Sequence, residues 1–433
     1  MIDTDFDVIV VGAGPAGSAA ALTAARAGAR VALLERGPFP GAKNMFGGVV
    51  YGRILDSLIP GWYDEMPVQR WITRRSTMML AGDRSFTVDF RAGEWGRAPY
   101  NGATVYRADF DAWLAQHATD AGATLVCDTV VTGLLTESGR VVGVRTDRSE
   151  GELRAPMVIA CDGVNTFLAK EAGIAGDTSP GNYTLGVKET LSIPRDVLEA
   201  RFGVRGIDGV DIEVVGSTGD VPGGGFIYTN LDTVAVGVVL RLPELATVQR
   251  RPEDILAEFK AHDAVATLVE GGEITEFSAH LIPEGGRDAM GELGCDGMLV
   301  AGDAAALCLA AGIWLEGVNF AIGSGAVAGR VAARAARSNT PGTALGEYRG
   351  ELEANFVLAD HTKLRGAPHL ILGERMQQRY PEIMCDIAQG MFTVDNPTPK
   401  PGLSKIARKA LRRHKVRFRD LARDGREIWR SFG

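Results

Sequence analysis

The chain contains few cysteines for its length, and those it has are scattered. Five occur among 433 residues, namely Cys127, Cys161, Cys295, Cys308 and Cys385. No two of them form a C-x-x-C pair, the spacing typical of zinc sites, redox dithiols and iron–sulfur ligands. We therefore expect neither a disulfide framework nor a metal centre in this chain.

Long apolar runs are also absent. The longest candidate, Met298–Leu315, is interrupted by Asp303, whereas a membrane-spanning helix needs about 18 or more apolar residues with few charges. The N-terminal segment MIDTDFD is acidic and lacks the basic region and apolar run of a secretory signal peptide. These features predict a cytoplasmic protein that does not cross a bilayer.

The most informative stretch is one unbroken unit between Phe6 and Arg36. A short β-branched run, Val8–Val11, leads into a G-x-G-x-x-G fingerprint, an Ala-rich helical stretch and a second apolar strand at Arg30–Leu34. An acid follows that strand, where a carboxylate can bind both ribose hydroxyls of an adenosine. Amide groups at the start of the helix can hold a pyrophosphate. The unit predicts dinucleotide binding by Gly12, Gly14, Pro15, Ala16, Gly17, Glu35 and Arg36.

The length of the chain predicts two or three domains. From about Tyr183 the pattern changes to consecutive alternating strands, which indicates an antiparallel sheet inserted into the dinucleotide-binding domain. We therefore predict an α/β fold with a Rossmann-like domain, a discontinuous α+β substrate domain with an antiparallel sheet, and a helical C-terminal region. The predicted ranges are 1–75, 100–182 and 287–345 for the first, 76–99 and 183–286 for the second, and 346–433 for the third.

Periodicity predicts several single elements. They are a hairpin at Ile72–Phe90, a strand pair at Leu125–Glu137 and Arg140–Asp147, and one helix at Glu253–Leu268. A long helix of small residues is expected at Gly317–Ala336. Three of its glycines resemble a second fingerprint, but no strand leads into them, so we attribute them to helix packing; they are Gly323, Gly325 and Gly329.

Two pairs of aspartate and glycine follow apolar strands. They are Asp162 with Gly163, and Gly302 with Asp303. The carboxyl ends of strands are the edge at which open α/β sheets bind ligands. The placement resembles the later motifs of flavoproteins with the para-hydroxybenzoate hydroxylase-like FAD fold. That resemblance implies FAD as the cofactor, with Asp303 near its ribityl and pyrophosphate groups and Arg107 also in contact with it.

A second resemblance covers essentially the whole chain. It rests on Gly41–Gly48, Gly224–Asn230, His280–Gly286, Ala367–His369, Tyr380–Glu382 and Phe392–Asp395. These segments resemble the Fix-type flavoproteins, relatives of electron-transfer flavoprotein:quinone oxidoreductase. The resemblance implies that electrons from an electron-transfer flavoprotein reach membrane quinone. The larger relatives carry a C-terminal ferredoxin domain with clustered cysteines, which is lacking here, so a separate ferredoxin-like protein is the implied source of the iron–sulfur cluster.

The flavin environment can be predicted in outline. The glycine-rich segment after Arg36 lets backbone lie against a flat ligand, which makes Lys43, Asn44, Gly47 and Gly48 candidate cofactor contacts. Lys43 either stabilises negative charge on the reduced ring or is an ordinary solvated lysine. Trp314 and Leu315 either line the quinone side or simply pack, and Glu316 is either exposed or paired. The amides of Gly317, Val318 and Asn319, where a loop enters a helix, could point at the flavin.

Other functions on the same fold remain open. A geranylgeranyl reductase-like flavoenzyme, which reduces isoprenoid double bonds, is the main alternative, although the Y-x-W-x-F-P segment of that class is absent. A halogenase would carry a W-x-W-x-I-P pattern, which is also absent. A flavin-bound scaffold for a membrane complex is the non-enzymatic alternative.

Positive charge is concentrated at the end of the chain. Residues 400–433 hold twelve Lys and Arg against three acids, although the net charge of the whole chain is −8. Between the basic residues of Leu403–Phe432, apolar residues recur at roughly helical spacing, which is typical of an interfacial helix. With the apolar loop expected at Val238–Val248, this predicts peripheral contact with the inner face of the cell membrane rather than nucleic-acid binding. The alternative is a basic helix that docks on the acidic body or on the ferredoxin-like partner.

Overall fold

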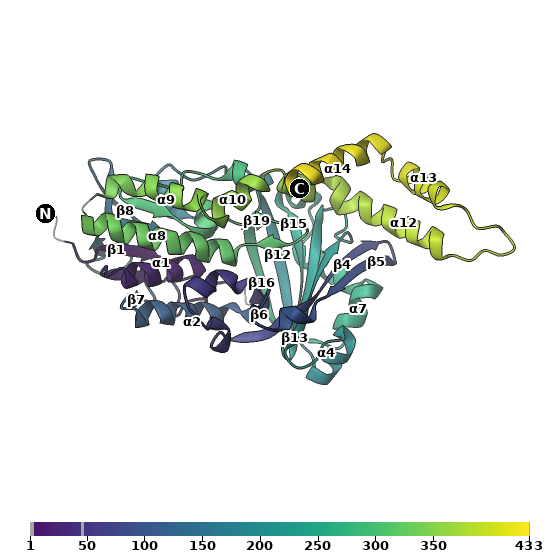
Figure 1. Cartoon of the computed structure of the whole chain (residues 1–433), viewed down its shortest axis with the longest axis horizontal. Helices are drawn as coiled ribbons and strands as arrows, with labels where there is room; N and C mark the ends of the chain where they lie inside the picture. Colours follow the sequence, from purple (N-terminus) through teal and green to yellow (C-terminus); the bar gives the residue numbers. More distant parts are fainter. Residues whose placement is uncertain (1–3, 45–46, 339, 433) are drawn as a thin grey trace.

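The computed structural model describes residues 4–44, 47–338 and 340–432, and its two largest sheets lie side by side (Figure 1). A mostly parallel sheet with its helices lies on the left in Figure 1, a larger, mostly antiparallel sheet, in which β13 and β4 pair in parallel, occupies the middle, and the last helices lie on the right. This architecture confirms the predicted α/β class with a helical C-terminal region. Met45 and Phe46, inside one of the motifs quoted above, lie outside the described residues.

The first sheet has the strand order β17–β18–β11–β1–β2–β7. Its strands are β17 (Gly294–Cys295), β18 (Met298–Val300), β11 (Met157–Ala160), β1 (Val8–Val11), β2 (Val31–Leu34) and β7 (Thr124–Val126). β17 runs antiparallel to β18, and the other neighbours are parallel. Every residue of β1, β2, β11 and β18 is buried, as expected for parallel strands that are covered on both faces.

Two helices, α1 (Pro15–Arg26) and α8 (Val318–Ser338), pack against each other on this sheet, and α2 (Arg107–Asp120) packs on α1. A methyl group on Gly325 would lie 2.0 Å from the carbonyl oxygen of Ala16, and one on Gly329 would lie 2.1 Å from that of Ala20. Side chains at these two positions would therefore push the helices apart. Close helix packing explains the glycines of α8, as predicted.

The strand expected at Leu125–Glu137 is in fact two strands, so that prediction was wrong. β7 belongs to the parallel sheet, whereas β8 (Val131–Glu137) pairs with β9 (Arg140–Thr146) and β10 (Glu152–Arg154) in a separate three-stranded sheet. Between them Asp128 has a φ of +49°, and its backbone N–H donates to the Gly37 carbonyl oxygen at 2.9 Å. That hydrogen bond holds the chain at the end of β2 and interrupts the extended conformation.

The largest sheet has the order β16–β12–β15–β14–β13–β4–β6–β3, with β5 also paired to β4. Its strands are β16 (Glu273–Pro283), β12 (Tyr183–Ser192), β15 (Thr233–Arg241), β14 (Gly223–Thr229), β13 (Asp208–Val215), β4 (Val68–Ala81), β6 (Ala103–Tyr106), β3 (Gly47–Val50) and β5 (Arg84–Arg91). β4 and β5 form the predicted hairpin. β4 continues across residue 76, where we predicted a boundary between the Rossmann-like domain and the substrate domain. The division of the chain into domains stays a prediction.

The two faces of this sheet differ in polarity because side chains alternate along each strand. On β13, the face with Val210, Ile212 and Val214 belongs to an apolar core that helices α4 (Arg195–Phe202), α6 (Pro252–Ala261) and α7 (Asp263–Val269) cover. The opposite face of β13 carries Asp211 and Glu213, which are also buried. Buried polar groups on one face of a sheet indicate a functional surface.

Two further predictions about single elements were wrong. The helix expected at Glu253–Leu268 is broken at His262, whose backbone is extended and whose Nδ1 accepts a hydrogen bond from the Ala264 N–H at 3.2 Å. This cap starts α7 as a new helix. The apolar loop expected at Val238–Val248 begins as buried strand β15, in which Val238 is fully buried, and continues as the short helix α5 (Leu242–Val248).

The C-terminal region is helical: its first two helices lie beside α8, and its last helices reach outward from the sheets (Figure 1). Its helices are α9 (Ala344–Glu353), α10 (Phe356–Lys363), α11 (Ala367–Ile371), α12 (Tyr380–Phe392), α13 (Leu403–Arg413) and α14 (Phe418–Phe432). The loop between α12 and α13 projects furthest to the right in Figure 1. Within the part of the chain that the structure describes, no helix has both the length and the apolar character needed to cross a membrane.

Candidate functional site

The glycine fingerprint lies at the carboxyl end of β1, where α1 begins. Gly12 has a φ of +96°, and a methyl group on it would lie 2.4 Å from the Cys161 carbonyl oxygen. A methyl group on Gly17 would lie 1.8 Å from the Gly12 carbonyl oxygen. Gly14 differs, because its nearest neighbour would be the Asn44 side chain at 3.9 Å. Gly12 and Gly17 are therefore required by the fold, whereas Gly14 faces open space that a ligand can approach.

Glu35 ties this turn to the next loop. It is only 8% exposed, its Oε2 accepts a hydrogen bond from the Ala13 N–H at 2.9 Å, and its Oε1 accepts one from the Gly37 N–H at 2.7 Å. Each carboxylate oxygen has a further lone pair with which to accept from a ribose hydroxyl. Its neighbour Arg36 is exposed.

A second group of polar side chains lies beside the fingerprint. Arg107 donates from Nε to Asp111 Oδ1 at 2.9 Å, and Asn44 donates from Nδ2 to Asp111 Oδ2 at 2.6 Å. Asp111 is fully buried and joins the loop of Asn44 to the first turn of α2. Sequence reasoning missed Asp111, although it lies four positions after Arg107 on one helix face.

The two predicted aspartates lie at the ends of neighbouring parallel strands, β11 and β18. Burial raises the pKa of Asp162 and also that of Asp303, which Arg107 and His280 face. Asp162 Oδ1 and Asn319 Oδ1 are enclosed, yet neither accepts a hydrogen bond from any described residue. Because buried polar atoms in native proteins nearly always have partners, these orphaned acceptors fit the hydroxyl and amide donors of a bound dinucleotide.

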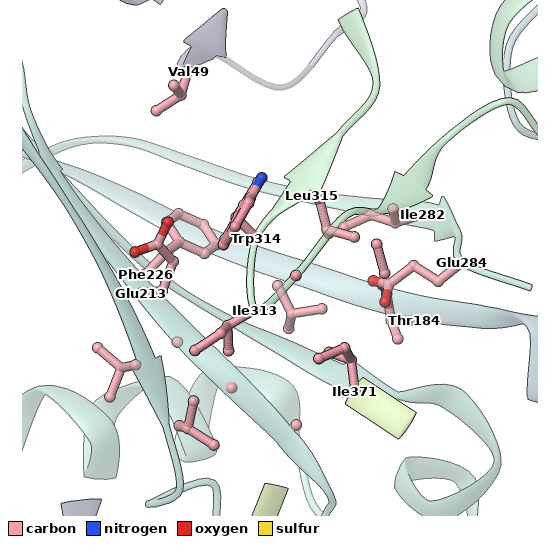
Figure 2. Close-up of a pocket in the computed structure, with 18 of the residues that line it drawn as sticks. Val49, Thr184, Glu213, Phe226, Ile282, Glu284, Ile313, Trp314, Leu315 and Ile371 are labelled. Carbon is pink, nitrogen blue, oxygen red and sulfur yellow. Dashed lines mark hydrogen bonds between the residues drawn. The ribbon is translucent and has the colours of Figure 1, made fainter. Parts of the chain in front are cut away.

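A cavity of about 230 Å³ adjoins this cofactor site (Figure 2). It lies between β3, the polar face of the large sheet, the hairpin of β19 (Leu309–Ala310) and β20 (Leu315–Glu316), and α11. Gly47 and Gly48 from the glycine-rich segment line one part of it, and apolar side chains such as Ile282 and Ile371 line another. A mostly apolar pocket with a few polar groups is typical of a small-molecule site.

Trp314 lies on this cavity and is held by charged groups. The Arg75 guanidinium lies 4.7 Å from the centre of the Trp314 ring and forms an ion pair with Glu213. The Trp314 Nε1–H donates to Glu316 Oε1 at 3.1 Å, and Asn319 Nδ2 donates to Glu316 Oε2 at 2.7 Å. Of the two alternatives for Glu316, the structure therefore shows the paired one. The hairpin is held to both the sheet and the start of α8.

Lys188 is a buried cation that sequence reasoning missed. It is 1% exposed, and its Nζ donates to the Gly47 carbonyl oxygen at 2.9 Å and to the Tyr228 hydroxyl at 3.3 Å. Burial, together with the nearby Arg107, lowers the pKa of Lys188 to about 7. The sequence did hold one indication of this burial. Lys188 lies in an alternating strand on the same face as Thr184, where an apolar or small residue would be usual.

Comparisons with known proteins agree with this geometry. Residues 7–182 match the family of FAD dependent oxidoreductases, and residues 367–433 match the C-terminal domain of the ETF-QO/FixC family. Protein FixC of Salmonella typhi is 39% identical to this chain over 427 residues, which cover 98% of both chains. The chain belongs to the FixC family. It is an FAD-dependent oxidoreductase, and its cofactor is FAD, as predicted.

Two further similarities place this FixC-family chain among its relatives. The protein of Escherichia coli (strain K12) named "Probable electron transfer flavoprotein-quinone oxidoreductase YdiS" is 37% identical over 429 residues, again 98% of both chains. A geranylgeranyl bacteriochlorophyll reductase-like protein from Thermoplasma acidophilum superposes with a TM-score of 0.73 at 20% identity, over 98% of this chain and 99% of its own. At that identity the second similarity shows the fold alone.

The structure of this FixC-family chain brings most of the predicted residues into one region. Most of them lie at the carboxyl edge of the parallel sheet: the fingerprint, Glu35, Asn44, Arg107, Asp162, Asp303 and Asn319. Three others lie where that region meets the cavity, namely Gly47, Gly48 and Trp314. Lys43 is exposed on its loop. Direct contact between FAD and each of these residues stays a prediction.

Proposed function

We propose that this chain accepts electrons that originate in an electron-transfer flavoprotein, through a separate ferredoxin-like protein, and passes them to a membrane quinone. The observation that carries the proposal is the cavity, because it shares Gly47 and Gly48 with the glycine-rich cofactor segment. A quinone ring in this cavity would lie next to that segment. Bound FAD supplies the ability to take up electrons singly and release a pair, which links an iron–sulfur donor to a quinone.

In this proposal, particular backbone segments and side chains of the chain have distinct roles. The α1 N-terminus and Gly14 bind the pyrophosphate, and Glu35 orients the ribose. The N-terminus of α8, at Gly317–Asn319, directs its helix dipole at the flavin ring. Trp314, held by Arg75, forms one wall of the quinone cavity and excludes water from it. Lys43 offers a positive charge at the exposed rim of the cofactor site.

Peripheral membrane contact would bring quinone to this cavity. Ile371 of α11 lines the cavity, and α11 packs against α14, which belongs to the basic tail. The apolar side chains of Phe418 and Trp429 on α14 are 65% and 77% exposed. A helix that faces anionic lipid with basic and apolar side chains would hold the cavity close to the bilayer.

Rapid mixing tests the proposed reaction. The FAD-loaded protein is reduced anaerobically and mixed with a soluble ubiquinone analogue or, separately, with NADP⁺, while flavin absorbance is followed. We expect prompt reoxidation by the quinone and none by NADP⁺. In steady state, an electron-transfer flavoprotein should drive quinone reduction only after the ferredoxin-like protein is added.

Each contrary outcome has a clear meaning. Failure of every quinone to reoxidise the reduced flavin would refute the quinone reductase proposal and leave a scaffold role. If the electron-transfer flavoprotein and this chain reduce quinone quickly without any further protein, the ferredoxin-like partner is not needed and that part of the proposal is refuted. Saturation of an isoprenoid substrate by the reduced protein would favour the geranylgeranyl reductase-like alternative, which at present is supported only by similarity of fold.

A further inference from the structure

Glu284 is a buried acid on the wall of the cavity. It directly follows β16, is 2% exposed, and accepts a hydrogen bond at Oε1 from the Thr184 hydroxyl of β12. Its backbone N–H donates to the Asn182 carbonyl oxygen at 2.9 Å, which fixes the turn. Figure 2 shows its carboxyl group next to Thr184, with Ile371 and Leu315 nearby. The acid therefore points into largely apolar surroundings from a rigid support.

The groups around Glu284 only partly offset the effect of burial on its pKa. Arg241, opposite Thr184 in the β12–β15 register, donates to the Leu372 carbonyl oxygen at 3.1 Å and pairs with Glu244 at 3.3 Å. Burial raises the pKa of Glu284 to about 7, although the Thr184 hydrogen bond and Arg241 act in the opposite direction. The other titratable group that faces it is Cys308, whose pKa burial raises well above its usual value.

The other cavity acids have different surroundings. Glu213 is held by an ion pair with Arg75, and Asp211 lies 3.5 Å from the same guanidinium. An adjacent arginine stabilises the charged form of a carboxylate, and Arg75 thereby opposes burial, which raises the pKa of Asp211 to about 6. No described arginine or lysine forms an ion pair with Glu284 within 4.0 Å. Of these three cavity acids, Glu284 is the one with no arginine ion pair, and its pKa of about 7 is higher than that of Asp211, so it is the acid best placed to carry a transferable proton at neutral pH.

We propose that Glu284 is the catalytic acid that protonates a quinone oxygen in this cavity, with Thr184 positioning its carboxyl group. This inference rests on the proposed quinone reductase function. The O–H bond of Glu284 breaks, and a new O–H bond forms on a quinone carbonyl oxygen. Bound FAD in its reduced form would supply the electron pair and the second proton, which balances the conversion of quinone to quinol. The resulting Glu284 carboxylate accepts the Thr184 hydrogen bond, is stabilised by Arg241, and regains its proton from water that enters the cavity after the quinol has left.

The test compares E284Q, E284D and the matched control E273Q, which changes an exposed glutamate at the other end of the same strand. Reduced, FAD-loaded proteins are mixed with decylubiquinone. We expect E284Q to be reoxidised roughly 10²-fold more slowly than wild type at pH 7, the scale of general acid catalysis. E284D should recover part of the rate, and E273Q should match wild type. The wild-type rate should fall as the pH rises above about 7, and E284Q should lack that limb.

Two measurements that do not depend on turnover accompany the kinetics. In an infrared pH titration, the carbonyl band of protonated carboxylic acids should contain a component that disappears from wild type as the pH passes about 7 and that E284Q lacks at every pH. Quenching of tryptophan fluorescence by decylubiquinone should give dissociation constants within threefold of each other for wild type and E284Q.

The outcomes separate this inference from the function on which it rests. If wild type is reoxidised by quinone and E284Q keeps the same rate and pH profile, Glu284 is not the acid and the function stands. If E284Q is slow only because it no longer binds decylubiquinone, the acid role is likewise refuted. If wild type itself is not reoxidised, both the function and the inference fail.

Discussion

At the scale of single residues, the sequence predicts those site residues whose partners lie close to them along the chain. Gly12, Gly17 and Glu35 lie within one continuous unit, so their spacing alone identified them. Lys188 and Glu284 gave no such signal, because their partners lie far away in sequence. Lys188 contacts Gly47, 141 positions earlier, and Glu284 contacts Thr184, 100 positions earlier. The pairing of β12 with β16 brings Glu284 to Thr184, whereas β12 and β3 are not neighbours in the large sheet, so the contact of Lys188 with Gly47 depends on its tertiary shape.

Lys188 should make the stability of the protein depend on pH. Its pKa falls from 10.5 to about 7 on folding, so between these values the unfolded chain binds a proton that the folded chain lacks. The free energy of unfolding therefore rises with pH in this window, by at most about 1.4 kcal/mol per pH unit from this group. K188M should flatten that rise between pH 7 and 9 in urea unfolding. K363M, at an exposed lysine of α10, should follow wild type; parallel curves for K188M and wild type would contradict the argument.

At the scale of elements, periodicity located most strands and helices but not their interruptions. The strands of the inserted sheet and the hairpin of β4 and β5 were predicted because they alternate regularly. The breaks at Asp128 and His262 were missed. A backbone hydrogen bond to a distant loop causes the first break, and a side-chain cap causes the second. Neither hydrogen bond alters the spacing of apolar residues along the chain, which was the basis of the predictions.

The packing of α1 against α8 gives a prediction at this scale. G329A would place a methyl group 2.1 Å from the Ala20 carbonyl oxygen and 2.2 Å from Thr23 Oγ1. We expect urea unfolding to show a loss of about 1–3 kcal/mol, and weaker FAD binding because α1 carries the fingerprint. G346A in α9, where a methyl group meets no atom within 4 Å, should instead gain about 0.5–1 kcal/mol. Equal stability of G329A and wild type would refute this account of the glycines.

At the scale of the whole molecule, an acidic body carries a basic C-terminal tail. The single interfacial pattern expected at Leu403–Phe432 is divided into α13 and α14. Part of it docks on the body: Leu411 packs with Ile383 of α12, and Asp424 pairs with Arg375. Four large apolar side chains of the tail are exposed, namely Leu403, Phe418, Ile428 and Trp429, whereas Ile406, Leu421 and Phe432 are half-buried. Of the two alternatives drawn from the sequence, docking on the body thus describes part of the tail, and contact of its free face with a membrane stays a prediction.

Liposome flotation tests what the free face of the tail binds. Each Lys or Arg near an anionic bilayer contributes about 1 kcal/mol, so the full chain should float with anionic vesicles more than with neutral ones. A chain ending at Lys400 should lose this binding. The double variant F418S/W429S keeps the basic residues and the Arg375–Asp424 pair, and it should bind anionic vesicles more weakly than wild type because apolar insertion is lost.

The control for flotation is I274S/F277S, which removes two comparably exposed apolar side chains, 58% and 45%, from the edge strand β16. It should float as wild type does. Thermal unfolding should confirm that all variants are folded, because truncation also uncovers the surface of α12. If the shortened chain and F418S/W429S both float as well as the full chain, lipid is not the partner of the tail. Its exposed basic and apolar side chains would then be free to bind an acidic protein such as the ferredoxin-like donor.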